Sequence, residues 1–370
     1  MTDGTYFKVG VVGASFAGLA CARATATRGI RTVVLERKRD VGEVPHTTGI
    51  LVKEVADTWD VPDDLTRKIH GVRLYAPSLR SVDLVSPGYY FLATDTPRLM
   101  RWLATEAEDA GATILTDTDY RGARWDRGRF WLEGADLSCQ LLVGADGAQS
   151  RIAREFGLGQ NQKFLVGMEA EYEGVSGVDL DRLHVFLDSE LARGYIGWVV
   201  PSVGITQIGL ACRPPARPNV DLFVRRLHEV FDFRFAKIVD RRGGLIPVGG
   251  PVHPLGRDGV LLVGDSAGLV SPLTAGGIHT ALHFGRRAGQ AISDHLLDGG
   301  PQPAQVLSDE VPSFLFKRLL RRTLDMPLPH RLYDHVLASP IFQSFARAIF
   351  FHNRGLLSRA AWRELAATRP

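Results

Sequence analysis

Three short apolar runs, each ending at a glycine, dominate the hydrophobic pattern of the chain. They cover residues 9–12, 141–143 and 260–263, and they end at Gly13, Gly144 and Gly264. Uninterrupted apolar runs of this length are typical of strands that are buried on both faces of a parallel sheet. Because parallel strands end at the same edge of a sheet, we expect the three glycine turns to lie together where α/β folds bind ligands.

The first run opens a predicted strand–helix–strand unit. Small residues predict a helix over 17–28, Gly29 ends it, and a second buried strand over 32–35 leads to the carboxylate of Glu36. The turn before the helix has the pattern Gly-x-Ser-x-x-Gly, whose backbone N–H groups can face a pyrophosphate while the later carboxylate meets a ribose. A plain strand–turn–helix unit without a ligand is the alternative, but the position of Glu36 favours dinucleotide binding.

Alternation of apolar and polar residues predicts a second, antiparallel sheet. Its expected strands cover residues 164–172, 183–187, 194–200 and 205–212, with shorter pieces at 72–75 and 82–85. Helical periodicity predicts helices over 97–110, 149–156, 219–235 and 278–297, and a mostly helical chain after residue 303. The expected fold class is α/β, with a Rossmann-like nucleotide-binding domain, a mixed or antiparallel-sheet second domain and a helical C-terminal segment.

Length and composition indicate a globular protein of more than one domain. The chain has 370 residues, of which 45% are hydrophobic, which exceeds one ordinary domain and suits a sizeable core. Its cysteines, Cys21, Cys139 and Cys212, are widely separated; they predict neither a disulfide framework nor a metal site and favour a reducing compartment. No apolar run approaches the roughly 18 residues that span a bilayer, so we expect a cytoplasmic protein.

Positive charge is concentrated near the C-terminal end of the sequence. Residues 305–370 carry ten Lys or Arg and five Asp or Glu, whereas the net charge of the whole chain is only +3. Two basic amphipathic stretches, 313–322 and 341–351, suit a lipid substrate or peripheral contact with an anionic membrane surface. The alternative is that these helices pack on the body of the protein and cover a substrate cavity. Nothing in the pattern supports nucleic-acid binding.

Taken together, the three glycine turns resemble the FAD-binding signatures of flavoproteins with the p-hydroxybenzoate-hydroxylase fold. Residues 143–150 and 264–268 carry this resemblance beside the first turn. The longer run from Gly264 to Leu282 is similar to the geranylgeranyl reductase family. Flavin monooxygenases of this fold usually have a histidine where this chain has Gly268, which favours the reductase branch.

The resemblance extends over residues 8–300 and implies a division into domains. We expect a discontinuous FAD-binding domain of residues 1–70, 92–162 and 250–300. Residues 71–91 and 163–249 would form the substrate domain, and residues 301–370 the helical C-terminal segment.

The resemblance also implies which residues bind FAD. Glu36 would hold the ribose, Asp146 the polar chain of the cofactor, and Asp265 its ribityl or pyrophosphate region. Gly276 and Gly277, at a helix start, would let backbone N–H groups approach the N1–C2=O edge of the flavin. The full expected set is Gly13, Ser15, Phe16, Ala17, Gly18, Glu36, Arg37, Thr48, Arg98, Asp146, Gly147, Gly264, Asp265, Pro272, Thr274, Ala275, Gly276, Gly277 and Ile278.

Candidate catalytic residues are fewer and depart in places from the family pattern. They are His46, His279, Tyr195 and Trp198. Archaeal reductases have a cysteine in the loop that corresponds to residues 44–49, where this chain has none, and many relatives have an arginine at the position of Thr96. The aromatic box that lines the substrate cavity in the family is represented by residues 195–201, with one extra residue; an ordinary core strand with aromatic residues is the alternative.

The activity implied by the resemblance is reduction of carbon–carbon double bonds in a geranylgeranyl-type isoprenoid chain, with hydride from flavin N5. A monooxygenase acting on an aromatic or other hydrophobic small molecule, a flavin-dependent isomerase or cyclase without net redox change, and a non-enzymatic flavin-binding protein are the alternatives. No second dinucleotide motif follows a strand, so NAD(P)H or ferredoxin would act as a transient electron donor. The oligomeric state stays open.

Overall fold

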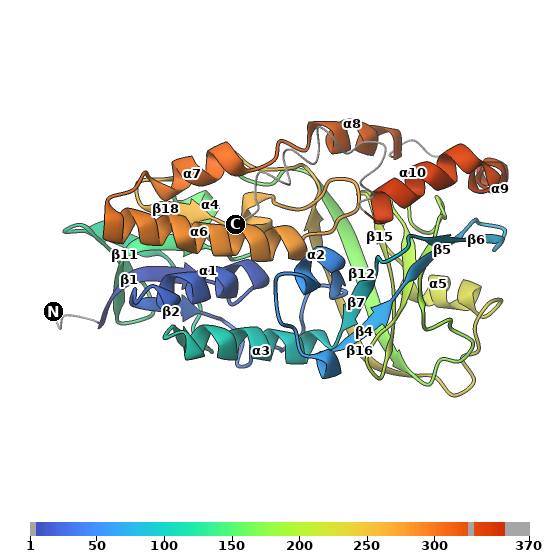
Figure 1. The fold of residues 1–370 in the computed structure, drawn as a ribbon, viewed down its shortest axis with the longest axis horizontal. Coiled ribbons are helices and arrows are strands. Elements are labelled where there is room, and N and C mark those ends of the chain that lie inside the picture. Colours follow the sequence, from blue (N-terminus) through green and yellow to red (C-terminus); the bar gives the residue numbers. More distant parts are fainter. Residues whose placement is uncertain (1–4, 325–328, 352–370) are drawn as a thin grey trace. The chain divides into compact units, whose positions relative to one another are not determined.

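The computed structural model describes residues 5–324 and 329–351, which form two compact units (Figure 1). The first unit comprises the described residues up to Pro45, Thr96–Phe164 and Ile246–Arg318. The second comprises His46–Asp95, Leu165–Leu245 and the described residues from Leu319 onward. Residues 46–70, which we expected in the FAD-binding domain, thus belong to the second unit.

A mainly parallel sheet forms the centre of the first unit. Its strands run in the order β17 (Gly256–Arg257), β18 (Val260–Leu262), β11 (Leu137–Gly144), β1 (Thr5–Val12), β2 (Thr32–Leu35) and β8 (Thr113–Leu115). A hairpin of β9 (Ala123–Asp126) and β10 (Arg129–Leu132) joins the edge of β11. The three apolar runs of the sequence are therefore the adjacent parallel strands β1, β11 and β18, and the predicted fold class is confirmed.

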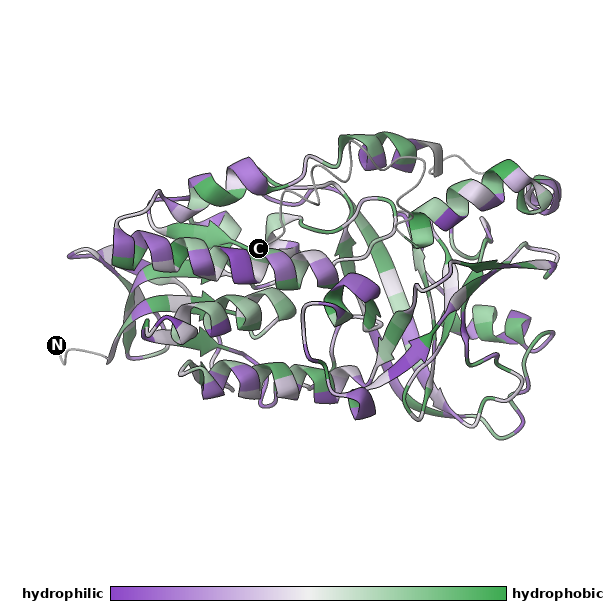
Figure 2. Ribbon diagram, in the orientation of Figure 1, coloured by the Kyte–Doolittle hydropathy of each residue, from purple (hydrophilic) through white to green (hydrophobic). Residues whose placement is uncertain are grey.

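Helices of the first unit are α1 (Phe16–Thr27), α3 (Thr96–Asp109), α4 (Arg151–Glu155), α6 (Ile278–Asp298) and α7 (Pro303–Glu310). Helices α1 and α6 approach one another closely because α6 has glycines at the contact. A Cβ atom on Gly289 would lie 2.6 Å from the Cys21 carbonyl oxygen, and one on Gly285 would overlap the backbone of Ala17. Figure 2 shows hydrophobic and hydrophilic residues along α6, as expected for a helix with one buried face.

The second unit is built on a seven-stranded sheet. Its strands run in the order β16 (Lys237–Pro247), β12 (Phe164–Glu173), β15 (Thr206–Cys212), β14 (Gly197–Pro201), β13 (Arg182–Phe186), β5 (Gly71–Tyr75) and β6 (Ser81–Val85). Neighbouring strands from β12 to β13 are antiparallel, whereas β13 and β5 are parallel. The predicted mixed sheet is therefore present, and the pieces at 72–75 and 82–85 form its last two strands, β5 and β6.

A small antiparallel sheet explains why residues 46–70 belong to this unit. It contains β3 (Ile50–Val52), β7 (Phe91–Thr94) and β4 (Thr66–Ile69), in that order. Two short elements, α2 (Lys53–Ala56) and the 3-10 turn η1 (Asp63–Leu65), connect β3 to β4. Because β3 and β4 both pair with β7, backbone hydrogen bonds hold the segment within this unit.

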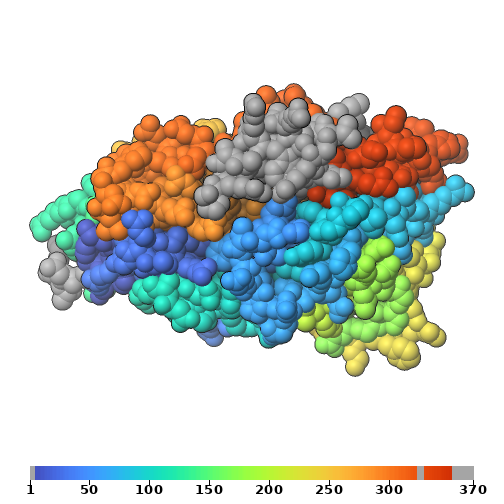
Figure 3. Space-filling model, viewed as in Figure 1, coloured from blue at the N-terminus to red at the C-terminus, as the bar shows by residue number. Residues whose placement is uncertain are grey.

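The two faces of the seven-stranded sheet are covered differently. Helix α5 (Val220–Leu227) packs on one face through Phe223 and Leu227, and it is shorter than the helix predicted over 219–235. The other face contacts α9 (His330–Ala338) and α10 (Pro340–Phe350) in a core that includes Leu337 and Ala346. Figure 3 shows α9 and α10, in red, as a continuous part of one molecular face. Across the described ranges, no helix is both long and apolar enough to cross a bilayer.

Candidate functional site

The first glycine turn connects β1 to α1 with little room for side chains. Gly13 has a φ angle of +102°, and a Cβ atom there would lie 2.5 Å from the Ala145 carbonyl oxygen. Ser15, at the position where the common motif has glycine, caps the helix: its Oγ accepts a hydrogen bond of 3.2 Å from the Gly18 N–H. A serine at this position therefore satisfies one N–H group of the helix start and leaves the turn intact. Phe16 and Ala17 are the first residues of α1.

Glu36 links the end of β2 to this turn. One of its carboxylate oxygens accepts from the Ala14 N–H at 2.8 Å, and the other accepts from the Lys38 N–H at 3.0 Å. The side chain is buried. Since each carboxylate oxygen can accept two hydrogen bonds, Glu36 can orient the turn and still accept from a ribose hydroxyl. Arg37, the next residue, is exposed, as is Arg98 in the first turn of α3.

Asp146 in the second turn has one oxygen engaged and one without a partner. Oδ2 accepts from the backbone N–H groups of Arg151 and Ile152, at 2.6 and 3.1 Å, where α4 begins. Oδ1 is buried and has no hydrogen-bond partner among the described residues. The neighbouring Gly147 has a φ angle of +84° with open space where a Cβ would stand. A buried acceptor of this kind is costly unless a ligand donor meets it, which fits a hydroxyl-bearing cofactor.

The third turn carries a partly buried carboxylate that faces the start of α6. Gly264 has a φ angle of +63° and begins the 3-10 turn η2 (Gly264–Ala267). A Cβ atom on Gly277 would lie 3.4 Å from Asp265 Oδ1, so this carboxylate lies beside the first residues of the helix. Burial raises the pKa of Asp265 to about 6. An acceptor so placed suits donors from the cofactor.

Asn161 joins the second and third turns and was missed from the sequence. Its Nδ2 donates to the carbonyl oxygens of Ala148, at 3.0 Å, and Asp265, at 2.8 Å. Its Oδ1 is buried and has no partner within the described part of the chain. No motif includes this residue, because it lies in a loop whose position relative to both turns is set by tertiary structure.

Backbone hydrogen bonds within the loop before α6 stabilise its conformation. Two backbone hydrogen bonds lie within the loop: the Ala275 N–H donates to the Ser271 carbonyl, and the Ser271 N–H donates to the Gly276 carbonyl. Ala275 has a φ angle of +51°. Gly277 is the N-cap of α6 and offers no side-chain cap to the first N–H groups of this 21-residue helix. Such a helix start favours negative charge, which is the property expected of a site for the flavin edge.

The other residues predicted near the flavin lie around the start of α6. Pro272, Thr274 and Ile278 lie in or next to the loop before the helix. His279 is in the first turn of α6, and its ring is 6.4 Å from that of His283.

Two of the residues predicted in the second unit, Thr48 and Trp198, contact a carboxylate that the sequence did not single out, Glu169. Its Oε2 accepts from the indole Nε1 of Trp198 at 2.6 Å and from the hydroxyl of Thr48 at 2.7 Å. Its Oε1 accepts from Arg242 Nε and from a terminal nitrogen of the same guanidinium, at 2.9 and 2.5 Å. Glu169 and Arg242 are both buried. Four donors therefore saturate one carboxylate and fix the orientation of the indole.

A glycine allows Trp198 to reach Glu169 across an intervening strand. In register, Trp198 of β14 lies opposite Gly209 of β15, which lies opposite Glu169 of β12. A Cβ atom on Gly209 would be only 2.5 Å from the indole ring. The side chain of Trp198 thus crosses over β15 because that position has no side chain of its own.

A second carboxylate shares the same arginine. Arg242 lies 2.7 Å from an oxygen of Glu171, which also accepts a long hydrogen bond of 3.4 Å from Gln207. Burial raises the pKa of Glu171. With two carboxylates and one guanidinium, the cluster has an excess of negative charge, and burial favours the neutral form of Glu171.

The other two candidates of this unit lie apart from that cluster. His46 is exposed, and its Nδ1 is 3.1 Å from the Gly243 carbonyl oxygen. Tyr195 lies beside the guanidinium of Arg321, which is 5.6 Å from the ring centroid, and burial raises the pKa of its phenol. Among the described residues no group of acidic, histidine or cysteine side chains is arranged to hold a metal ion.

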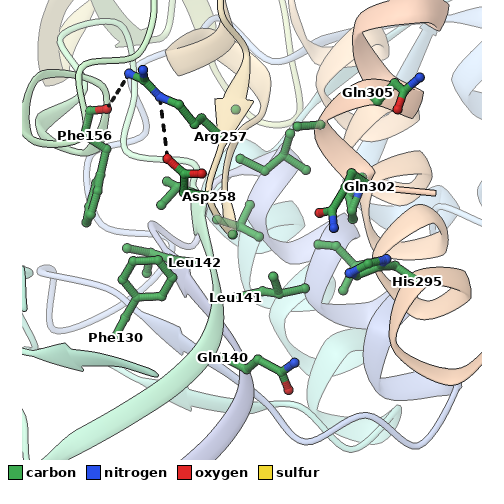
Figure 4. Close-up of a pocket in the computed structure, with 18 of the residues that line it drawn as sticks. Phe130, Gln140, Leu141, Leu142, Phe156, Arg257, Asp258, His295, Gln302 and Gln305 are labelled. Carbon is green, nitrogen blue, oxygen red and sulfur yellow. Dashed lines mark hydrogen bonds and ion pairs between the residues drawn. The ribbon is translucent and has the colours of Figure 1, made fainter. Parts of the chain in front are cut away.

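One large surface hollow of the first unit does not involve the predicted cofactor residues. It has a volume of about 1300 Å³ and is lined by Phe130, Gln140, Arg257 and His295 among others (Figure 4). It lies at the amino end of β18 and near the C-terminal end of α6, whereas the cofactor residues lie at the start of that helix. At 1.5 Å per residue, His295 lies about 25 Å along the helix from its first residue, Ile278.

Known protein families and proteins include relatives of this chain. A family model described as FAD binding domain matches residues 6–208. The chain is 35% identical over 310 residues to digeranylgeranylglycerophospholipid reductase 2 of Methanopyrus kandleri, with 78% of this chain and 77% of that protein covered.

Two solved structures have a similar fold. A geranylgeranyl bacteriochlorophyll reductase-like protein of Thermoplasma acidophilum gives a TM-score of 0.81 at 21% identity, covering 99% of this chain and 100% of that chain. A probable FAD-dependent monooxygenase of Pseudomonas aeruginosa gives 0.69 at 18% identity, covering 90% and 100%. Because reductases and monooxygenases share the fold, the sequence relationship is what distinguishes them. The chain belongs to the geranylgeranyl reductase family of FAD-dependent oxidoreductases.

Proposed function

We propose that this protein reduces carbon–carbon double bonds in the geranylgeranyl-type chains of a lipid. The observation that carries the proposal is the 35% identity, over 78% of this chain, to a protein named digeranylgeranylglycerophospholipid reductase. When bound, FAD would supply a hydride from N5 to one carbon of the double bond, with a proton reaching the other carbon from a nearby acid or water.

The first unit would hold the cofactor through acceptors at three turns. Glu36 is the proposed partner of the ribose, Asp146 and Asn161 of the hydroxyls of the central part, and Asp265 of the ribityl region. The unoccupied acceptor capacity of Asp146 and Asn161 supports this assignment. The uncapped start of α6 would stabilise negative charge on the flavin ring.

The second unit would orient the isoprenoid chain against an apolar sheet face. Trp198 is partly buried beside the core that contains Val185 and Val200, and Glu169 holds its indole in one orientation. We assign Trp198 to substrate contact and Glu169 to positioning of that indole. His46, Thr48, Tyr195 and His279 stay proposals for groups near the flavin or the substrate.

Electrons would come from a separate donor that binds transiently. The strand–turn–helix pattern of the sequence provides one dinucleotide site, which the proposal assigns to FAD. Either NAD(P)H or ferredoxin would therefore bind only while reducing the flavin. Comparing the two donors in steady-state assays distinguishes them.

The test is product analysis with the flavin-loaded protein, a digeranylgeranyl glycerophospholipid and a reductant, with and without oxygen. The proposal predicts a mass gain of two hydrogens for each double bond reduced, in the absence of oxygen. A product that gains oxygen, formed only in air, would instead establish a monooxygenase. Turnover of the lipid to an isomer without use of reductant would establish the isomerase alternative.

A further inference from the structure

Helix α8 (Leu315–Leu324) presents large apolar side chains to the outside. Leu315 is 62% exposed, Phe316 56% and Leu319 51%. In a soluble protein a helix with one apolar stripe normally turns that stripe toward the core. Three large apolar residues on one outward stripe therefore call for an explanation, whereas a single one would not.

The inward side of α8 is instead basic. Arg321 is buried; its guanidinium donates to the Gly194 carbonyl oxygen and lies over the ring of Tyr195. Lys317, one turn earlier, is partly buried, and this burial lowers the pKa of its ammonium group. The helix is thus held to the protein by its cationic side, which fixes the apolar stripe outward.

Two further arginines flank the outward stripe. At 100° per residue, Arg318 and Arg322 lie next to Leu315 on the helix surface, and both are exposed. The outward face therefore has arginine side chains along one edge and leucine and phenylalanine side chains along the other. This is the side-chain distribution of helices that lie in the plane of a membrane interface.

The helices after α8 also combine exposed apolar side chains with an excess of positive charge. Ile341, at the start of α10, is 83% exposed, and Leu332 of α9 is also exposed. Described residues 315–322 and 329–351 carry six Lys or Arg and a single acidic residue, Asp334. That acid accepts a hydrogen bond from the hydroxyl of Ser78. The exposed charges of this part of the chain are therefore positive.

We propose that the outward face of α8, formed by Leu315, Phe316, Leu319, Arg318 and Arg322, docks on the surface of an anionic lipid bilayer. The apolar side chains enter the boundary between headgroups and acyl chains, and the arginines reach the lipid phosphates. Charge selects this occupant, since a basic surface is complementary to anionic headgroups. The inference goes beyond the proposed reaction and does not depend on it.

The experiment measures flotation of the full-length, flavin-loaded protein with vesicles of phosphatidylcholine alone or mixed with phosphatidylglycerol. We expect binding to the anionic vesicles only, weakening as salt is raised. The triple variant Leu315→Ser/Phe316→Ser/Leu319→Ser should lose binding at least tenfold, as judged by the vesicle concentration for half-maximal flotation. Arg318→Gln and Arg322→Gln should each weaken it about fivefold.

Phe235→Ser is the matched control, because Phe235 is 77% exposed and lies outside the C-terminal helices; its flotation should equal that of the wild type. Equal binding of the triple variant and the wild type would overturn the proposal, as would absence of binding to anionic vesicles. A concentration-dependent dimer that the triple variant abolishes, without vesicle binding, would instead assign the face to a second copy. Turnover of detergent-dispersed substrate, measured in parallel, separates failure of docking from failure of the proposed reaction.

Discussion

The carboxylates of the two units differ in how many of their acceptor oxygens have a hydrogen-bond donor. In the first unit Asp146 has a buried oxygen without a partner in the described chain, and Asp265 is a partly buried carboxylate with a raised pKa. In the second unit Glu169 accepts from four donors supplied by Thr48, Trp198 and Arg242. The carboxylates of the first unit can therefore accept hydrogen bonds from a ligand, whereas the carboxylate of Glu169 already has its hydrogen-bond partners within the protein. Substitutions in the first unit should therefore act on cofactor binding, and those around Glu169 on stability and on the orientation of Trp198.

The largest effect is expected from Arg242→Met. It leaves Glu169 and Glu171 buried without their cation, and breaking a buried ion pair in this way costs about 3–5 kcal/mol of the free energy of unfolding. Urea denaturation measures this loss. The neighbouring Arg241 pairs with Asp221 at the surface, so Arg241→Gln should cost less than about 1 kcal/mol. Equal losses in the two variants would show that the buried cluster contributes no more to the free energy of unfolding than a surface ion pair does.

Asp265→Asn should stabilise the flavin-free protein, with a pH dependence that follows from the raised pKa. Because the folded protein binds this proton more tightly than the unfolded chain, wild-type stability falls as pH rises from 3.8 to about 6. Above that range the asparagine variant should be more stable by up to about 3 kcal/mol, while its affinity for FAD decreases. Thermal unfolding across this pH range tests the prediction. Asp258→Asn, at a position of the same unit whose side chain is 91% exposed, serves as the control and should change neither the stability nor the affinity for FAD.

Gly209→Ala tests whether the indole must cross β15. The added methyl group would meet the ring of Trp198 at 2.5 Å, so the indole must move away from Glu169, at a cost of about 1–3 kcal/mol. Tryptophan fluorescence and urea denaturation report the two consequences. At Gly244 of β16 the nearest atom to an added Cβ is 3.8 Å away, and alanine there should change neither. An unchanged environment of Trp198 in the Gly209 variant would contradict the crossing.

Asn161→Ala should have the smallest effect and act on the cofactor. It removes two hydrogen bonds that join the second and third turns, each worth about 1 kcal/mol, and it removes a buried acceptor. We expect the dissociation constant of FAD to rise about tenfold, which corresponds to about 1.4 kcal/mol. Fluorescence titration measures this constant. Gln140→Ala, in the hollow at the amino end of β18, should leave it unchanged.

The same contrast explains how much could be predicted from the sequence. The glycine turns are local: Gly13, Ser15 and Gly18 act within six residues, and the apolar runs before the turns report burial directly. The membership of the three apolar runs in one parallel sheet, the start of α6 and the positions of Glu36, Asp146 and Asp265 after buried strands were therefore predictable from motifs and periodicity. The role of Ser15 as a helix cap was not, because an N-cap depends on the backbone angles of the turn.

The framework around Glu169 could not be predicted for a different physical reason. Its members come from separate strands, and only the register between β12, β15 and β14 brings Gly209 between Glu169 and Trp198. The place of residues 46–70 in the second unit is similarly unpredictable, because nothing local in the sequence reveals that β3 and β4 pair with β7. For α8, periodicity predicted an amphipathic helix, whereas the contact of Arg321 with Gly194 decides which side faces outward.

Reduction of isoprenoid double bonds is best tested by a single-turnover reaction of the reduced protein with lipid under strict exclusion of oxygen. The visible absorbance of the flavin is followed after mixing with a digeranylgeranyl glycerophospholipid, and in parallel with the fully saturated lipid of the same head group. Lipid reduction predicts that the oxidised flavin spectrum returns with the unsaturated lipid only, together with a product heavier by two hydrogens. No return of the spectrum with either lipid, or an equal return with both, would contradict the claim that this protein reduces isoprenoid double bonds.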